Sequence, residues 1–430
     1  MTRRRRLAAA LGGRTFASLR NRNYRLYFIG QAISFTGTSM QTIAAAWLVL
    51  QLTHSPVAVG ALALVSLLPV TVFGLFVGTI VDRFSVLRTA IVCEALSMVL
   101  AAVLAAFTLT GHVVVAEVFV LTALQGVVNA IDAPARHSLV FQMVGPRNLP
   151  NAVALSSSLG TMSRISGPAI GGVVVALWGP GVCFALNSAS FLGILACLLM
   201  LDTSTMLRPG RDRTASLLGG ARDSLRFVRQ SRRAGVAFIV VFMLATFAFN
   251  FTVLLPLVAD RTLHQGAGTF GLIAATFGVG ALCGALINAT HGVASLRRLL
   301  IGAMGFGVFE LVLAPERSLG AVCVLLLVIG TFYTLWGTNA LSVLQLEAPE
   351  HLRGRAAALY FFAFQGGAPI GGLLAGWLVS QGGTRVAFLV GGLVSISAAA
   401  WGILRLARDE NEEASVAETA LSLWRSALQR

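Results

Sequence analysis

Apolar residues along this chain come in long runs separated by short polar gaps. A membrane-spanning helix needs about 20 mostly apolar residues, and the runs approach that length twelve times along the sequence. The pattern therefore predicts an all-α membrane protein with twelve transmembrane helices in two six-helix bundles. The predicted spans are residues 26–50, 58–81, 89–110, 113–134, 150–178, 181–201, 235–259, 267–290, 298–314, 318–346, 355–380 and 385–405.

The longest polar gap divides these spans into two sets of six. The predicted organisation is a basic tail at 1–25, a first bundle at 26–201, a linker at 202–234, a second bundle at 235–407 and a tail at 408–430. The linker carries an amphipathic helix, which we expect to lie on the membrane surface against anionic headgroups, unless it is merely a solvated charged helix. Its apolar face is Leu217, Leu218, Ala221, Leu225 and Val228, and its basic face is Arg222, Arg226, Arg229 and Arg233.

Composition agrees with a lipid environment, and the placement of charge orients the chain. Hydrophobic residues make up 56% of the 430 residues and charged residues 11%, with a net charge of +15. Of the 32 basic residues, all arginine, 28 lie in the gaps on one side, three on the other, and Arg164 lies within a span. Because basic loops remain cytoplasmic, both termini are predicted in the cytoplasm of a bacterial inner membrane. The same placement explains the basic pI of about 11.3 without a nucleic-acid partner.

The residue inventory argues against several kinds of chemistry. Without lysine, the chain has neither a P-loop lysine nor a Schiff-base lysine. Its five cysteines are isolated in apolar runs, and its six histidines are scattered without an H-E-x-x-H motif. We therefore expect no cofactor, no metal site and no enzymatic activity.

Two short motifs recur six spans apart. Residues 167–172 read Gly-Pro-Ala-Ile-Gly-Gly in the fifth span, and residues 368–372 read Ala-Pro-Ile-Gly-Gly in the eleventh. A weaker pair is Gly-Thr-Ile-Val-Asp at 78–82 and Gly-Ala-Leu-Ile-Asn at 284–288. Internal repeats of this kind are typical of secondary transporters, in which two bundles rock about a site near the membrane midplane.

The residues that follow the second span resemble a loop motif of the major facilitator superfamily. The segment 78–88 reads G-T-I-V-D-R-F-S-V-L-R and resembles the family pattern G-x-x-x-D-R-x-G-R-[KR], from which it departs at residues 85–87. The resemblance implies a cytoplasmic gate in which Asp82 faces the start of the eleventh span. The alternative is ordinary anchoring of charged loops at the interface. The predicted gate residues are Gly78, Asp82, Arg83, Arg88, Asp132 and Arg136.

The fifth span carries the motif that suggests a direction of transport. Residues 163–172 resemble a pattern that, within the superfamily, marks exporters and antiporters more than importers. Glycines allow close helix approach and proline bends a helix, although a general small-residue packing face would look the same. The motif residues are Gly167, Pro168, Gly171 and Gly172.

Further likeness, at 129–136, 149–155 and 352–356, is to the enterobactin-exporter-like branch of the superfamily. The resemblance implies a monomeric secondary transporter that exports a drug- or siderophore-like small molecule by alternating access, as a proton antiporter. An importer or facilitator on the same fold, or a transporter-like sensor, remains the alternative.

Ionisable side chains within spans are the candidates for proton coupling. Glu94 is the first choice, Glu310 the second, and Arg164 is predicted to bind an anionic substrate or to pair with Glu94 or Asp132. Polar side chains at helical spacing are candidates for the cavity wall, with hydrogen bonding between helices as the alternative. These are Gln31, Ser34, Thr38 and Gln41 in the first span and Asn250 in the seventh.

Overall fold

The protein, seen here as a computed structural model, is helical wherever its structure is described. That part comprises residues 17–81, 85–207, 226–290, 294–349 and 353–428, without the side chains of 73–81, 161, 165, 353–355, 357–358 and 408–428. The helices of the first half are α2 (Arg22–Thr53), α3 (Pro56–Val81), α4 (Val86–Leu109), α5 (Val115–Trp178) and α6 (Pro180–Leu199). Those of the second half are α8 (Arg232–Phe247), α9 (Phe251–Leu257), α10 (Ala267–Thr290), α11 (Leu296–Leu313), α12 (Leu319–Glu347), α13 (Arg353–Gly366) and α14 (Ala368–Leu428).

Helix α5 contains the fourth and fifth predicted spans in one element. Its backbone leaves helical geometry at Gly145, where φ is 69° and ψ is 174°. Glycine tolerates this positive φ because it has no Cβ. The fourth span was predicted to end at residue 134, but the helix continues to this glycine. In the same way α14 joins the eleventh and twelfth spans across Gly382 and Gly383.

Two spans that were predicted to be continuous are broken near their middles. The seventh consists of α8 and α9, separated at residues 248–250, followed by a π-helical turn (Val258–Thr262). The eleventh consists of α13 and the start of α14, separated at Gly367. Pro369 lies in the first turn of α14, and its missing N–H and bulky ring disfavour a helix that continues through it. The prediction of continuous helices was wrong at these two points.

Within the described residues, eight helical stretches are long and apolar enough to cross a membrane. Two of them, Val115–Trp178 and Leu359–Ala407, each include two predicted spans, and the apolar part of α3 (Pro56–Val72) is shorter than a full span. The helices are therefore consistent with twelve passes.

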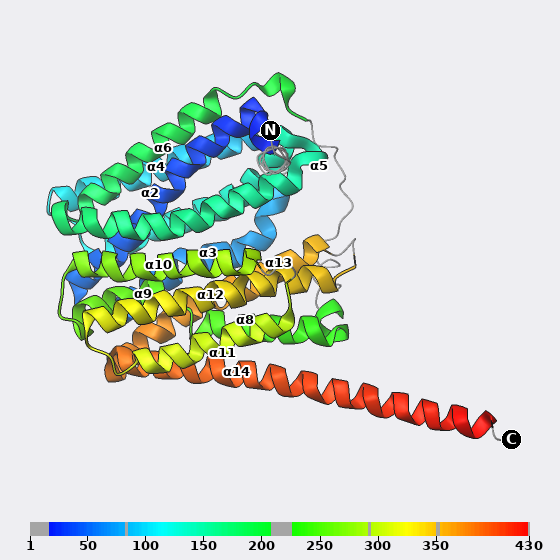
Figure 1. Ribbon diagram of the computed structural model, residues 1–430. Coiled ribbons are helices and arrows are strands. Elements are labelled where there is room, and N and C mark those ends of the chain that lie inside the picture. The colour runs from blue at the N-terminus through cyan, green and yellow to red at the C-terminus, as the bar shows by residue number, and fades with distance from the viewer. Residues whose placement is uncertain (1–16, 82–84, 208–225, 291–293, 350–352, 429–430) are drawn as a thin grey trace, which may run out of the picture.

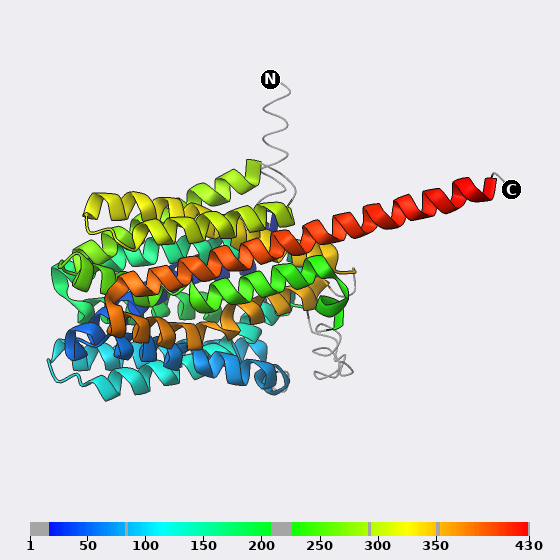
Figure 2. The ribbon, with the colours of Figure 1, turned by 90° about the horizontal axis from the view of Figure 1, so that it is seen from below.

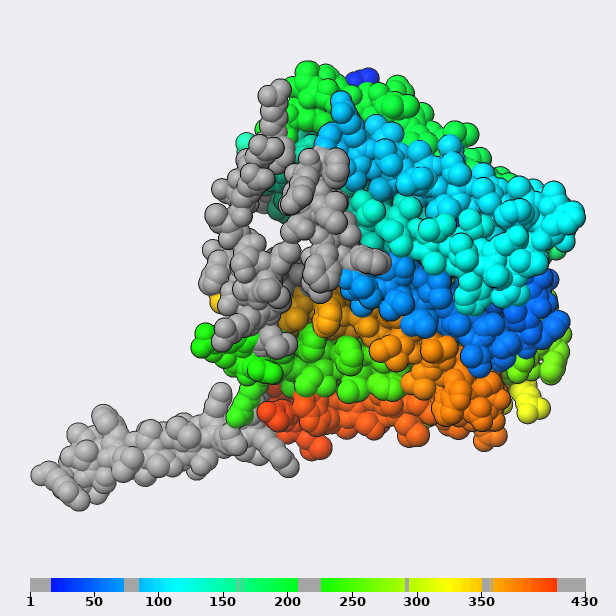
Figure 3. Space-filling model, turned by 180° about the vertical axis from the view of Figure 1, so that it is seen from behind, coloured from blue at the N-terminus to red at the C-terminus, as the bar shows by residue number. Residues whose placement is uncertain are grey.

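The helices pack as two bundles that meet along two seams. In the first half α2 packs against α5 and α6, and α4 packs against α6, while in the second half α12 packs against α10 and α11. The seams between the halves are formed by α3 with α14 and by α5 with α10. Figures 1 and 2 show these layers from two directions. In Figure 3, α3 in blue lies between α4 in cyan and the orange start of α14.

We call the end of the bundle at which α2 begins the inner end and the opposite one the outer end. At the outer end the Trp47 and Phe270 rings stack across the halves, with centroids 5.9 Å apart. Arg261 Nη2 donates a hydrogen bond of 2.6 Å to the carbonyl of His54. In Figure 1 the ribbons of α2, α5 and α6 lie close to α10 at the left and diverge from it towards the right, the inner end. The outer ends of the halves are thus in contact.

Candidate functional site

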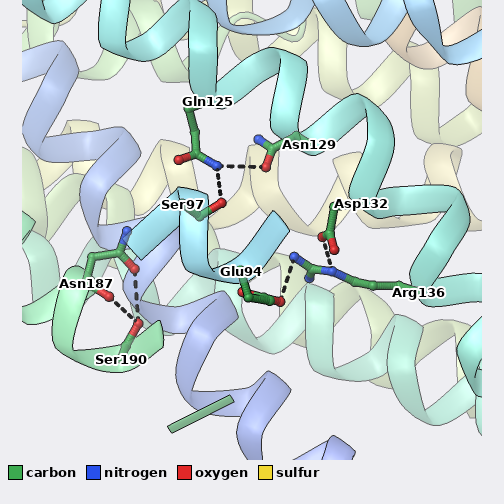
Figure 4. Close-up of polar contacts among 8 residues, drawn as sticks. All are labelled: Glu94, Ser97, Gln125, Asn129, Asp132, Arg136, Asn187 and Ser190. Atoms are coloured by element: carbon green, nitrogen blue, oxygen red, sulfur yellow. Dashed lines mark hydrogen bonds and ion pairs between the residues drawn. The ribbon is translucent and has the colours of Figure 1, made fainter. Parts of the chain in front are cut away.

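A cluster of three charged side chains is buried in the first half. Glu94 comes from α4, and Asp132 and Arg136 come from one face of α5 (Figure 4). The Arg136 guanidinium lies 3.2 Å from a Glu94 oxygen, and its Nε contacts Asp132. The Phe35 ring lies 5.1 Å from the guanidinium carbon. Glu94 and Asp132 are 2% and 3% exposed.

The cluster contains two carboxylates for one guanidinium. Glu94 Oε2 and Asp132 Oδ1 have no hydrogen-bond partner among the described residues. A buried charge without full compensation costs several kcal/mol, so a cation or a proton bound at this cluster would be stabilised. The fold thus joins two gate residues, Asp132 and Arg136, with the first proton-coupling candidate, Glu94.

A polar chain extends from this cluster towards the outer end. Gln125 Nε2 donates to Ser97 Oγ at 2.8 Å and to Asn129 Oδ1 at 3.0 Å (Figure 4). Ser97 follows Glu94 by about one helical turn, and Asn129 precedes Asp132 by the same interval. Sequence reasoning missed Gln125 and Ser97, although Ser, Gln and Asn in a membrane helix are a signal for contacts between helices.

Glu310 is buried alone in the second half. The side chain is fully buried in α11, and neither carboxyl oxygen has a hydrogen-bond partner among the described residues. A Cβ added to Gly391 would lie 3.0 Å from Glu310 Oε2 and 3.2 Å from the Cα of Ala248. Glu310 therefore adjoins the break between α8 and α9.

Arg164 lies between the two halves. It is exposed on α5, and the hydroxyl of Tyr333, from α12 of the second half, is its hydrogen-bond partner. The predicted pairing with Glu94 or Asp132 is not what the structure shows, because both carboxylates pair with Arg136. The reason is geometric, since Arg136 follows Asp132 by one helical turn.

Aromatic rings of the second half surround the partner of Arg164. Phe249, at the break between α8 and α9, stacks on Tyr333 with centroids 4.3 Å apart and planes 6° from parallel. Trp336 lies edge-on to Tyr333 at 5.6 Å, and Phe364 and Phe277 lie 5.6 Å and 6.2 Å from Phe249. Sequence reasoning noted Phe249 only as part of an aromatic run, because the other rings come from distant segments.

The glycines of the fifth-span motif lie where helices approach most closely. A Cβ on Gly167 would collide with Ser39 of α2, and one on Gly171 would lie 3.1 Å from the Cα of Met40. Gly172 instead contacts the backbone of Gly271 in α10, across the seam between the halves. Backbones approach this closely only where side chains are absent.

The eleventh-span motif repeats this arrangement in the other half. Gly371 abuts the carbonyl of Thr246 in α8, the counterpart of α2. A Cβ on Gly372 would lie 2.9 Å from the Cβ of Ala63, and the Gly372 carbonyl abuts Gly60 of α3, again across a seam. Each motif thus contacts the first helix of its own half and the second helix of the opposite half, which extends the repeat from sequence to packing.

The remaining gate residues are less completely placed. Gly78 lies in the last turns of α3, Arg88 is exposed at the start of α4, and Asp82 and Arg83 lie outside the described residues. In the second half the counterpart position Asn288 accepts a hydrogen bond of 2.9 Å from Asn339, so this corner is held by amides.

The predicted cavity-wall residues form contacts within the first and second halves. Gln41 accepts a hydrogen bond of 2.6 Å from Asn187 of α6, and Asn250 donates one of 2.9 Å to the carbonyl of Thr246. Gln31 and Ser34 are 2% and 1% exposed, while Thr38 is half-buried. The structure thus shows hydrogen bonds between or within helices for Gln41 and Asn250, the alternative that the sequence left open.

The fold is that of major facilitator transporters. A bacterial homologue of the human lysosomal transporter Spinster, solved in an inward-facing and unoccupied conformation, matches with a TM-score of 0.71 at 12% identity, over 90% of this chain and 96% of that one. A D-xylose–proton symporter matches with a TM-score of 0.69 at 14% identity, over 88% and 96% of the two chains. These similarities show the fold.

Sequence comparison defines the family. The family described as transmembrane secretion effector, within the major facilitator superfamily, matches residues 13–426, and the chain belongs to it. The multidrug efflux pump Tap of Mycobacterium tuberculosis is 28% identical over 85% of this chain and 88% of its own. The staphyloferrin A transporter of Staphylococcus aureus is 21% identical over 81% and 88%, and macrolide efflux protein A of Streptococcus pyogenes 22% over 87% and 94%. The chain is therefore a multi-pass membrane transporter of the efflux branch and not an enzyme.

Proposed function

We propose that this protein exports a small molecule from the bacterial cytoplasm by alternating access, in exchange for protons. The observation that carries the proposal is the pair of glycine contacts, Gly172 with Gly271 and Gly60 with Gly372, which join the two halves. Contacts between bare backbones can separate without leaving unpaired polar groups, so they suit a seam that opens and closes. The efflux relatives support the outward direction.

Proton coupling is assigned to buried carboxylates. Glu94 shares Arg136 with Asp132, so a proton on Glu94 would weaken one ion pair and leave the guanidinium to Asp132. Glu310 is the second candidate, because it is buried without a partner beside the break in the seventh span. Protonation in the outward-open state and release towards the cytoplasm would couple proton entry to substrate exit.

The proposed gate closes the inner end in the outward-open state. Asp82, Arg83 and Arg88 would meet the start of α13, where a helix N-terminus favours a carboxylate. Asp132 and Arg136 would transmit the protonation of Glu94 to this gate, because all three belong to one cluster. The gate would then form only when the substrate site faces outwards.

The proposed orientation places both termini in the cytoplasm, with the protein acting as a monomer. The arginine-rich loops support this orientation through the preference of basic residues for the cytoplasmic side. In the linker, Phe227 is buried while Arg226 and Arg229 are exposed, and the rest of the predicted amphipathic helix lies outside the described residues.

Transport into everted membrane vesicles tests direction and coupling together. The lumen of such a vesicle corresponds to the outside of the cell, so an acidic lumen should drive accumulation of a labelled macrolide or of naphthoate. Collapse of the pH gradient with an ionophore should abolish accumulation. Accumulation only in right-side-out vesicles would identify an importer, and binding without flux in either orientation would identify a sensor.

A further inference from the structure

The region around Arg164 lies at the middle of the membrane-spanning helices. Arg164 is halfway between Pro150 and Trp178, the limits of the fifth span, and Tyr333 is halfway along α12. Gly172, which touches the opposite half at the outer seam, lies eight residues further along α5, about 12 Å at 1.5 Å per residue. The contact between Arg164 and Tyr333 therefore lies well below that seam.

A broken helix opens at the same level. Asn250, with φ −112° and ψ 36°, interrupts the seventh span, and Phe249 at the break stacks on Tyr333. Helix breaks near the bilayer midplane are typical of substrate sites in transporters, because unwound backbone there must line a cavity or be enclosed by protein. The break and the arginine thus meet at one aromatic residue.

The charge at this point lacks a counter-ion. Among the described residues, the carboxylates of the first-half cluster belong to Arg136, and Arg164 is held by the neutral hydroxyl of Tyr333. A guanidinium at the midplane is costly unless it faces water, a carboxylate or a ligand. Because the side chain is exposed and touches the opposite half, it is available to a molecule between the halves.

The facing wall is aromatic and half-buried. Phe249, Phe277, Tyr333 and Phe364 are each only partly covered, and Trp336 closes the wall behind them. Partly exposed rings stack on planar apolar groups. Arginine binds carboxylates through two parallel hydrogen bonds, which a hydroxyl cannot match.

We infer that Arg164 and this aromatic wall form the substrate site, and that its ligands are planar aromatic molecules carrying an acidic group. The ligand's anion replaces the Tyr333 hydroxyl on Arg164, and its ring system lies against Phe249 and Tyr333. This inference rests on the proposed function and adds the class of substrate. Because Arg164 belongs to the first half and the rings to the second, a bound ligand contacts both halves at once.

Equilibrium binding to the full-length protein in lipid nanodiscs tests the inference, with three probes that differ only in charge. Naphthoate is the anion, naphthylmethanol the neutral analogue and naphthylmethylamine the cation. The expected order of affinity is anion, neutral, cation, with naphthoate at least tenfold tighter than naphthylmethanol. Equal affinities, or a preference for the amine, would overturn the assignment.

Variants separate the arginine from the aromatic wall. Arg164→Gln should remove the preference for naphthoate and leave naphthylmethanol binding unchanged, whereas Arg385→Gln, at an exposed arginine of α14, should change neither. Tyr333→Phe should bind naphthoate at least as tightly as the original chain, because the competing hydroxyl is gone. If Arg164→Gln does not fold, Arg164→Lys should keep the charge and still weaken naphthoate several-fold. Retention of the full naphthoate preference in either Arg164 variant refutes the site.

This binding experiment involves no gradient and no direction. Loss of the anion preference would remove the proposed substrate class and leave export to be judged in everted vesicles. An intact preference combined with inward flux would overturn the export proposal and leave the site in place.

Discussion

Adding a single methyl group at the outer seam should shift the protein towards its outward-open state. In the substitution Gly271→Ala the new Cβ would lie 2.6 Å from the Cα of Gly172 and 3.0 Å from its carbonyl carbon. Carbon atoms in contact normally lie about 3.5–4.0 Å apart. The two helices must therefore separate by roughly 1 Å at this point.

The size of the shift follows from the state in which the contact exists. Overpacking of a well-fitted contact typically costs about 1–3 kcal/mol, and here only the closed outer seam carries that cost. The gain in helix propensity from Gly to Ala, about 1 kcal/mol, is common to both states and cancels. The ratio of outward-open to outward-closed protein should therefore rise roughly fivefold to 150-fold.

Distance measurement between two spin labels reads this ratio directly. Cysteines introduced at Gln51 and Gln265, both exposed at the outer end on opposite halves, would carry the labels in a cysteine-free variant. Gly271→Ala should add or enlarge a population at longer distance. Double electron–electron resonance in nanodiscs measures that population.

Gly268→Ala is the matched control. Gly268 lies one turn earlier in α10, and a Cβ there would lie at an ordinary 3.5 Å from the Cβ of Ala176. The control should keep the original distance distribution. If both variants give the same distribution, the Gly172–Gly271 contact does not govern the seam, and the reasoning is refuted.

Three further substitutions test other parts of the proposed mechanism. Glu94→Gln removes one of the two carboxylates that share Arg136, so export into everted vesicles should lose most of its pH dependence; an unchanged pH profile would assign the proton site elsewhere. Asp82→Asn should reduce flux at least several-fold while the protein still reaches the membrane, and unaltered flux would remove Asp82 from the gate. Gly167→Leu should abolish transport, because even a Cβ at this position collides with Ser39; normal export would reduce the motif to packing.

The buried cluster illustrates the limit of sequence reasoning about the site. Glu94, Asp132 and Arg136 were each recognised because a charge in an apolar run is conspicuous. Their grouping was not predicted, since it depends on how α4 and α5 are rotated about their axes. Arg164 was recognised in the same way, but its partner, Tyr333, lies in the opposite half, far away in sequence.

What the sequence by itself determined is the membrane architecture. Hydropathy and arginine placement are local and additive along the chain, so they predicted the all-α fold, the approximate spans, the orientation and the division into halves. The repeated Pro-x-Gly-Gly segments predicted that the halves are related, and family comparison agrees with the superfamily that the motifs suggested.

The tertiary structure alone decided which groups meet. The breaks at residues 248–250 and Gly367, the contact of Gly172 with Gly271 and the aromatic wall around Phe249 all depend on helix packing. Such contacts join segments that are distant in sequence, and a change of one helical turn would alter every partner. Hydropathy records only that a side chain tolerates lipid or protein, and it is the same for either partner.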